Sequence, residues 1–129
     1  MANKKTYEVK IMKAVGTCDS DMFRLMAEEG DLNATRIKEV MGENVTIKGF
    51  ARVEIKTEEK EFAMMYVDTD EFGLLSAGSG IFADSVEKYY NKGVKRFTLK
   101  EIKTKKGNTY KATPRLESQK DETVDDLPF

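Results

Sequence analysis

The stretch that most constrains the fold is a long alternating segment from Asn44 to Lys56, NVTIKGFARVEIK. Counted in steps of two, its aliphatic residues and its one glycine share a face, and mostly polar residues share the other. This alternation is typical of a β-strand with one buried face. Gly49 lies on that buried face without a side chain, so we expect the strand to bend or bulge there.

The polar face of this strand carries one large apolar side chain, Phe50, between Lys48 and Arg52. An aromatic ring flanked by two cations suits a nucleic-acid base stacked on the ring and a phosphate on either side. The other interpretation is structural. Strands in barrels often have both faces covered, and another part of the chain then buries Phe50.

The composition indicates a globular protein and argues against several functional classes. The 129 residues are 40% hydrophobic and 35% charged, which suits one domain with a core. No apolar run approaches the roughly 20 residues of a membrane span, and the start MANKKTYEV lacks a secretory signal. With no histidine and a lone Cys18, we expect no disulfide, metal site or cofactor. We predict a cytoplasmic protein that is not an enzyme.

Charge is distributed unevenly along the chain. The whole chain has a net charge of −1, but residues 116–129 carry −4 and residues 1–115 carry +3. A mildly basic body with an acidic tail predicts a body that binds polyanions. Residues 116–129 are too polar to fold alone. We therefore predict a folded domain over 1–115 and a flexible, disordered acidic tail over 116–129.

The first 42 residues predict a strand and two helices ahead of the long strand. Tyr7 to Val15 alternates as a strand does. Asp19 or Ser20 is expected to cap a helix that ends at Glu29, and a short helix fits Ala34 to Met41. The longer helix has an apolar stripe that is expected to be core, formed by Met22, Leu25 and Met26 and widened by Phe23 and Ala27.

The order of elements after the long strand indicates the fold. Its pattern predicts strands at Glu61–Thr69 and Leu74–Ala77, a helix at about Gly80–Asn91 capped by Ser79, and strands at Val94–Lys103 and Thr109–Thr113. Three strands, a helix and two strands is the order of the OB-fold, a five-stranded barrel. An open α+β sheet is the alternative. We favour a mainly β protein with a barrel over about 43–114 and an N-terminal strand-helix extension over 1–42.

Either face of the strand Glu61–Thr69 is a candidate for burial. The turn Lys105-Lys106-Gly107-Asn108 joins the last two strands, and in OB-folds this loop frames the ligand face. Lys105 and Lys106 at the tip of this turn, with Tyr110 and Lys111 just behind it, combine cations with an aromatic residue, as the long strand does. A solvated lysine hairpin is the alternative. We predict base stacking by Phe50, Tyr66 and Tyr110. We predict phosphate contacts by Lys48, Arg52, Lys105, Lys106 and Lys111.

The acidic tail finishes with Asp125, Asp126, Leu127, Pro128 and Phe129. A terminal ring beside a carboxylate suits a partner with an apolar pocket next to a basic residue, and the two aspartates suit a basic rim. These five residues are the predicted partner-binding segment. The alternative is a tail without a role.

These five residues resemble the acidic tip of bacterial single-stranded DNA-binding proteins, in which an OB-fold binds the strand and the tip recruits replication, recombination and repair proteins. The chain lacks the tryptophans and the long Gly/Gln/Pro-rich linker of that family. The patterns IKGFARVEI, GSGIFADSVEKYY and KTKKGNTYKATP, across roughly residues 35–114, are more similar to divergent members encoded by phages and conjugative plasmids of Gram-positive bacteria.

The resemblance implies a phage- or plasmid-encoded protein of the bacterial cytoplasm that binds and protects single-stranded DNA without sequence preference. It also implies that a helicase, polymerase or recombinase docks on the tail during DNA replication or recombination, and it implies no membrane partner. The alternative is a protein-interaction adaptor on the same scaffold without nucleic-acid binding. The sequence leaves the oligomeric state open, a homo-oligomer included, as well as the choice between DNA and RNA.

Overall fold

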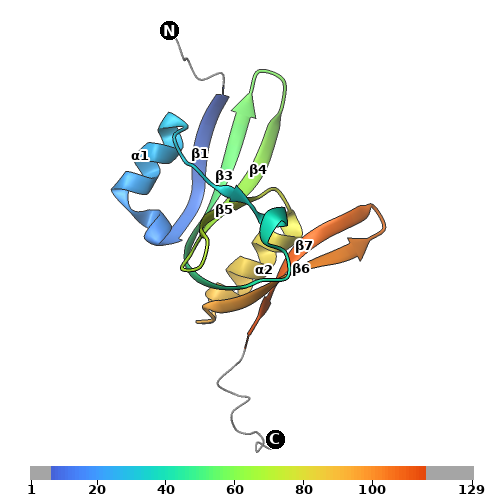
Figure 1. Ribbon diagram of the computed structural model, residues 1–129. Helices are drawn as coiled ribbons and strands as arrows, with labels where there is room; N and C mark the ends of the chain where they lie inside the picture. The colour runs from blue at the N-terminus through green and yellow to red at the C-terminus, as the bar shows by residue number, and fades with distance from the viewer. Residues whose placement is uncertain (1–6, 116–129) are drawn as a thin grey trace, which may run out of the picture.

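The computed structural model describes residues 7–115, and there one curled, half-barrel sheet carries two α-helices (Figure 1). The strands are β1 (Tyr7–Gly16), β2 (Thr35–Arg36), β3 (Asn44–Thr57), β4 (Glu61–Thr69), β5 (Gly73–Ala77), β6 (Arg96–Thr104) and β7 (Gly107–Pro114). The helices are α1 (Asp21–Glu29) and α2 (Gly80–Tyr90), with 3-10 turns η1 (Thr17–Asp19) and η2 (Ile37–Val40). The order along the sheet is β2-β5-β4-β3-β6-β7, and β1 also pairs with β3.

Most of the predicted elements are present. Both helices begin at serine caps, because Ser20 Oγ accepts from the N–H of Phe23 at 3.0 Å and Ser79 Oγ from that of Phe82 at 3.2 Å. The predicted short helix over 34–41 is wrong. Its first half forms β2, which pairs in parallel with β5, and only the four residues of η2 remain for a helical turn.

Strand β3 is the centre of the sheet because it pairs with three other strands. It pairs with β4 along one edge. Its other edge is shared: residues 44–46 pair with β6, and residues 49–57 pair with β1. All three pairings are antiparallel. The sheet therefore divides beside β3 into an upper part, containing β1, and the β6–β7 hairpin, which projects away from it (Figure 1).

A β-bulge at Lys48 changes which face of the sheet the even-numbered and odd-numbered residues of β3 point to. Between Ile47 and Gly49, β3 has two steps opposite one step of β4, so the alternation of side chains shifts by one residue. The larger of two hydrophobic cores, which we call the main core, contains Phe82, Val86, Phe97 and Leu99. Before the bulge, Val45 and Ile47 of β3 are buried in this core, and after the bulge Phe50 is buried in it. Later odd-numbered residues enter a second core instead, formed by Ala51, Val53 and Ile55 with Cys18, Phe23 and Ala27.

Helix α1 covers the second core. Phe23 and Ala27, one turn apart, are buried, and the Phe23 ring packs edge-on against Tyr66 of β4 with centroids 6.2 Å apart. The expected core stripe is therefore wrong in part, since Met22 and Leu25 are 64% and 54% exposed. The helix carries apolar residues on more than one face, and only one face can pack on the sheet.

Helix α2 covers the main core. Phe82 and Val86 are fully buried there with Phe97 and Leu99 of β6. Beside them, Ser85 Oγ accepts a hydrogen bond from the N–H of Ala112 at 3.0 Å, so the helix lies along the edge of β7. None of the helices within residues 7–115 is long and apolar enough to cross a membrane.

Two facing glycines allow β1 to end against the bulge. Gly16 pairs with Gly49, and its φ of 63° is a left-handed value that glycine adopts readily. A Cβ added to Gly49 would lie 2.5 Å from the Thr17 nitrogen and 2.6 Å from the Val15 carbonyl oxygen. Both are backbone atoms, so the close approach excludes any larger residue.

We predict that Gly49→Ala lowers the free energy of unfolding by about 2–3 kcal/mol, because overpacking against backbone cannot be relieved by a rotamer change. Gly80→Ala is the matched control, since a Cβ there meets nothing within 4 Å and α2 should be unchanged or slightly stabilised. Urea unfolding of the three proteins measures both effects. Equal stability of wild type and Gly49→Ala would contradict the assigned close approach.

Candidate nucleic-acid interface

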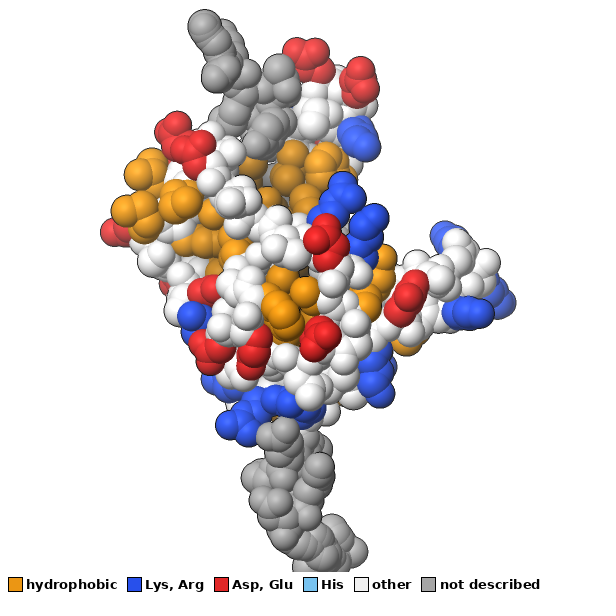
Figure 2. Space-filling model, in the orientation of Figure 1, with side chains coloured by type: hydrophobic (Ala, Val, Ile, Leu, Met, Phe, Trp, Pro, Cys, Tyr) orange, Lys and Arg blue, Asp and Glu red, His pale blue; other side chains and the backbone are white. Residues whose placement is uncertain are grey.

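The β6–β7 hairpin, residues 96–115, is a strongly basic projection that we call the basic arm. It contains seven Lys or Arg residues and one glutamate, a net charge of +6. Residues 7–95 contain 12 basic and 17 acidic residues, a net charge of −5. Figure 2 shows Lys and Arg side chains gathered around the arm. Positive charge available to a polyanion is thus concentrated on one element.

Five lysines of the arm are exposed: Lys100, Lys103, Lys105, Lys106 and Lys111. None of them forms an ion pair with another residue in the range 7–115. Lys100 lies directly opposite Lys111 across the two strands, an arrangement in which like charges repel. Such a pair favours a ligand that supplies negative charge.

The arm is held against α2 partway along its length, and only its last strand pairs and the turn extend beyond that contact. Ser79 Oγ lies 2.7 Å from Thr109 Oγ1, which ties the start of α2 to β7. At the tip, Lys105 and Lys106 form the turn, and Thr104 Oγ1 accepts from the N–H of Lys106 at 3.2 Å. Gly107, with a φ of 123°, supplies the expected positive φ. The two tip lysines therefore stand on a defined turn.

Tyr110 lies on the opposite face of the arm from Lys111. It is half-buried and packs against the main core, on the side of the hairpin that also carries Leu99 and Ala112. Tyr110 is therefore partly exposed on the arm, and its buried part contributes to the main core.

The predicted stacking role of Phe50 is wrong. Its side chain is fully buried and packs at 90° to the ring of Tyr90, with centroids 5.4 Å apart. The cause is the bulge, which turns Phe50 into the main core, where burial of such a ring is worth roughly 1.5–3 kcal/mol. Tyr90 also donates to the Lys48 carbonyl oxygen at 3.3 Å and so holds the bulge itself.

The two cations that flank Phe50 lie beside carboxylates. Lys48 Nζ lies 3.5 Å from Asp70 and 3.9 Å from Asp68. Arg52 Nη1 donates to Glu87 at 2.8 Å and to Asp84 at 3.1 Å, and these partners raise the pKa of the guanidinium. The positive charge of both side chains is partly compensated within the protein, unlike that of the five exposed arm lysines.

Tyr66 is separated from the arm by the sheet. It is half-buried on the face of β4 that α1 covers, against Phe23. Of the eight predicted nucleic-acid contacts, four thus lie together on the basic arm: Lys105, Lys106, Tyr110 and Lys111. The predicted partner-binding residues Asp125 to Phe129 lie outside the described residues.

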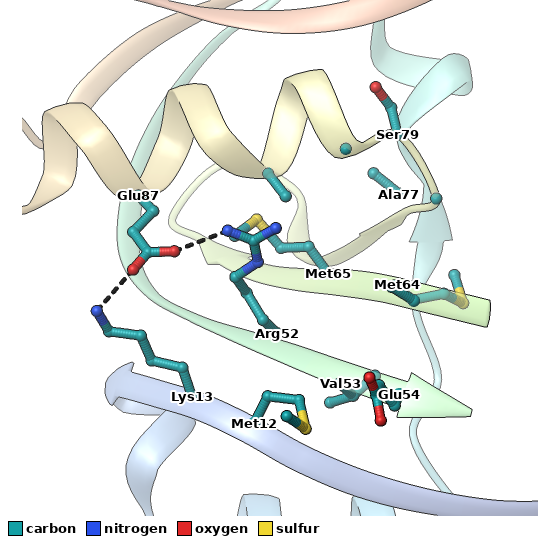
Figure 3. A pocket seen from close by; sticks show the side chains of 14 residues that line it. Met12, Lys13, Arg52, Val53, Glu54, Met64, Met65, Ala77, Ser79 and Glu87 are labelled. Atoms are coloured by element: carbon teal, nitrogen blue, oxygen red, sulfur yellow. Dashed lines mark hydrogen bonds and ion pairs between the residues drawn. The ribbon is translucent and has the colours of Figure 1, made fainter. Parts of the chain in front are cut away.

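A cavity of about 260 Å³ opens beside the arm, between the upper part of the sheet and the start of α2 (Figure 3). Its apolar lining includes Met12, Met64 and Met65, and Ser79 belongs both to its rim and to the anchor of the arm. Sequence reasoning missed this cavity, because its walls come from five elements: β1, β3, β4, β5 and α2. It also did not predict Lys100 and Lys103 as phosphate contacts, although the net charge of residues 96–115 indicates that this whole hairpin is basic.

Glu87 connects two strands to α2 at this cavity. Its carboxylate accepts from Lys13 Nζ at 2.6 Å and from Arg52, and the bond with Lys13, followed by that with Arg52, lowers its pKa. The network ties β1 and β3 to the helix.

Acidic side chains and the single cysteine, Cys18, are the residues of this chain with metal-ligating or thiol chemistry. Within residues 7–115, no group of three or more His, Cys, Asp or Glu side chains is placed to hold a metal ion. Cys18 is fully buried, and desolvation, with a contribution from Asp68, raises its pKa to about 12. Its thiol therefore stays protonated at neutral pH and is a poor nucleophile.

No protein-family model, curated protein or solved structure matches this chain. The function is therefore inferred from the chemistry of the arm and the cavity.

We predict that Glu87→Gln lowers the free energy of unfolding by about 1 kcal/mol at pH 7, since it removes a partly buried ion-pair network. The lowered pKa of Glu87 means that its contribution is present above the unfolded-state pKa of about 4.3 and is lost as the pH falls through the folded-state value. Urea unfolding from pH 7 to pH 3 should show the difference shrinking.

Asp84→Asn is the matched control, because the Asp84 side chain is 76% exposed and its loss should change stability little. A stability difference for Glu87→Gln that is the same at pH 7 and pH 3 would show that charge is not its source.

Proposed function

We propose that this protein binds single-stranded DNA through the basic arm. The observation that carries the proposal is the set of five exposed arm lysines that lack ion pairs among the described residues, on a body of net negative charge. Lysine ammonium groups contact phosphates without reading sequence. Binding is therefore expected to be independent of sequence along the arm and sensitive to salt.

We also propose that the fold is OB-like, and the pairing of the strands supports this. β3 pairs with both β4 and β6, as the first strand of an OB-fold pairs with the second and the fourth, and α2 lies between β5 and β6. Among residues 7–115 no strand pairing joins β5 to β7, and α2 lies along the β7 edge instead. The basic arm then corresponds to the loop that frames the ligand face in OB-folds.

A single strand suits the arm better than a duplex. Its bases are free to contact side chains, and Tyr110 is a half-buried aromatic residue of the same hairpin, on the face opposite Lys111. The resemblance of Asp125–Phe129 to the tip of single-stranded DNA-binding proteins adds independent support. In this proposal the segment recruits replication or recombination enzymes while the arm holds DNA, as expected of a phage- or plasmid-encoded protein.

One observation favours an adaptor as the second candidate. Met22 and Leu25 of α1 are large apolar side chains that remain more than half exposed. An adaptor would bind a protein there and would not bind DNA, so measurements of DNA binding distinguish the two functions.

We predict that the double variant Lys105→Gln/Lys106→Gln binds oligo-dT about tenfold more weakly at 0.1 M salt. Each lost phosphate contact on a single strand should also reduce the slope of log K against log salt by about 0.7. Fluorescence anisotropy of a labelled oligo-dT at several salt concentrations measures the affinity and the slope.

Lys88→Gln/Lys92→Gln is the matched control, with the same change in charge at the end of α2 distant from the arm tip. It should bind like wild type. Binding of wild type that does not weaken with salt, or equal affinity for duplex and single strand, would count against the proposal and favour the adaptor.

We predict that deletion of Asp125–Phe129 leaves the affinity for oligo-dT within about twofold of wild type, because the arm that contacts phosphate is intact. The same deletion should abolish co-purification of a host helicase, polymerase or recombinase. Pull-down from host extract with wild type, deletion and Phe129→Ala proteins measures recruitment. Undiminished recruitment by the deletion protein would remove the assigned role of the segment.

A further inference from the structure

We propose that the cavity beside the arm binds one guanine base of the bound strand, an inference that rests on the proposed single-stranded DNA binding. The cavity, at about 260 Å³, is smaller than sites for drug-sized ligands, which begin at roughly 300 Å³, and suits one base. Its lining combines apolar side chains with a small number of charged groups on β1, β3 and α2 (Figure 3).

Arg52 presents a free donor edge to this cavity. Its two hydrogen bonds, to Asp84 and Glu87, are both made by Nη1. Nε and Nη2 have no hydrogen-bond partner among residues 7–115. Figure 3 shows the guanidinium projecting from β3 toward α2, with one nitrogen turned to Glu87 and the other edge facing the Ala77 and Ser79 side. That edge offers two parallel N–H donors, held in place by the carboxylates.

The local charge excludes a phosphate as the group that Arg52 holds. Lys13 and Arg52 are the cations at the cavity, and three carboxylates oppose them: Glu54, Asp84 and Glu87. The net charge of about −1 repels an anion, whereas a neutral group with two adjacent acceptors meets no such penalty. Among the bases, guanine offers such a pair, O6 and N7, which is the commonest partner of arginine.

Glu54 completes the recognition of guanine. It lies two residues from Arg52 on the same face of β3, roughly 6–7 Å along the strand. It is exposed, lines the cavity and forms no ion pair with another residue in 7–115. Its carboxylate can accept from the N1–H and N2–H of guanine. Adenine would instead present its N6 donor to Arg52, which is also a donor.

The position of the cavity lets one strand use both sites. Ser79 lines the cavity, and its Oγ is 2.7 Å from Thr109 Oγ1 of the arm. A strand whose phosphates lie along the arm lysines can therefore extend one base into the cavity. There, the thioether of Met12, which is 52% exposed, can contact the flat ring.

The test compares four labelled 12-nucleotide strands by fluorescence anisotropy: oligo-dT, and oligo-dT with one central dG, dA or 7-deaza-dG. Wild type is expected to bind the dG strand about fivefold or more tightly than the others, since a bidentate contact gives at least that discrimination. The 7-deaza strand lacks only the N7 acceptor. Weaker binding of this strand than of the dG strand therefore tests the contact to N7 while the protein stays unaltered.

Two variants locate the preference in the cavity. Arg52→Lys keeps the charge but removes the planar donor edge, and Ala63→Leu fills the cavity from an exposed position on β4. Both are expected to reduce the ratio of dG to dT affinity to about one. Lys56→Gln, on the same face of β3 but outside the cavity, is the control and should keep the ratio.

Equal binding of all four strands by wild type, or a dG preference that survives in both variants, overturns the guanine site and leaves the proposed function intact. Failure of wild type to bind any of the strands overturns both. A dG preference that 7-deaza-dG retains overturns the role of the Arg52 donor edge.

Discussion

The architecture depends on a one-residue irregularity in β3. Because Lys48 bulges, the side-chain alternation of β3 shifts, and one strand supplies residues to two cores on opposite faces of the sheet. The bulge is held by the hydroxyl of Tyr90 and by the backbone approach at Gly16 and Gly49. The same shift buries Phe50 and directs Arg52 toward α2, where its carboxylate partners lie.

The distribution of charge gives the molecule a defined polarity. The body is acidic, and its cations Lys13, Lys48 and Arg52 lie beside carboxylates, whereas the arm concentrates lysines around one glutamate. Repulsion between Lys100 and Lys111 costs stability unless an anion intervenes. Ser79 and Ser85 hold β7 against α2 and thus support this charged hairpin.

The proposed arm and cavity divide binding into two physical parts. Phosphate contacts supply affinity and position without sequence information, while a base in a lined cavity supplies discrimination. Their shared residue is Ser79, which both caps α2 and contacts β7. In the sequence, the run Gly78-Ser79-Gly80 indicates the end of a strand and the cap of a helix; in the structure it also forms part of the cavity wall.

Local signals in the sequence determined the order of the longer strands and of the two α-helices, the caps at Ser20 and Ser79, and the lysine turn, because each depends on neighbouring residues only. They did not reveal β2, which forms by pairing with the distant β5. The glycine at position 49 also indicated an irregularity in this part of β3, where the structure has the bulge at Lys48. Tertiary structure alone decided that Phe50 is buried, since one extra residue reverses a period of two and alternation cannot reveal it. It alone paired Arg52 with carboxylates 32 and 35 residues away and chose which face of α1 packs on Tyr66. Such choices depend on contacts between distant segments, which a local pattern does not contain.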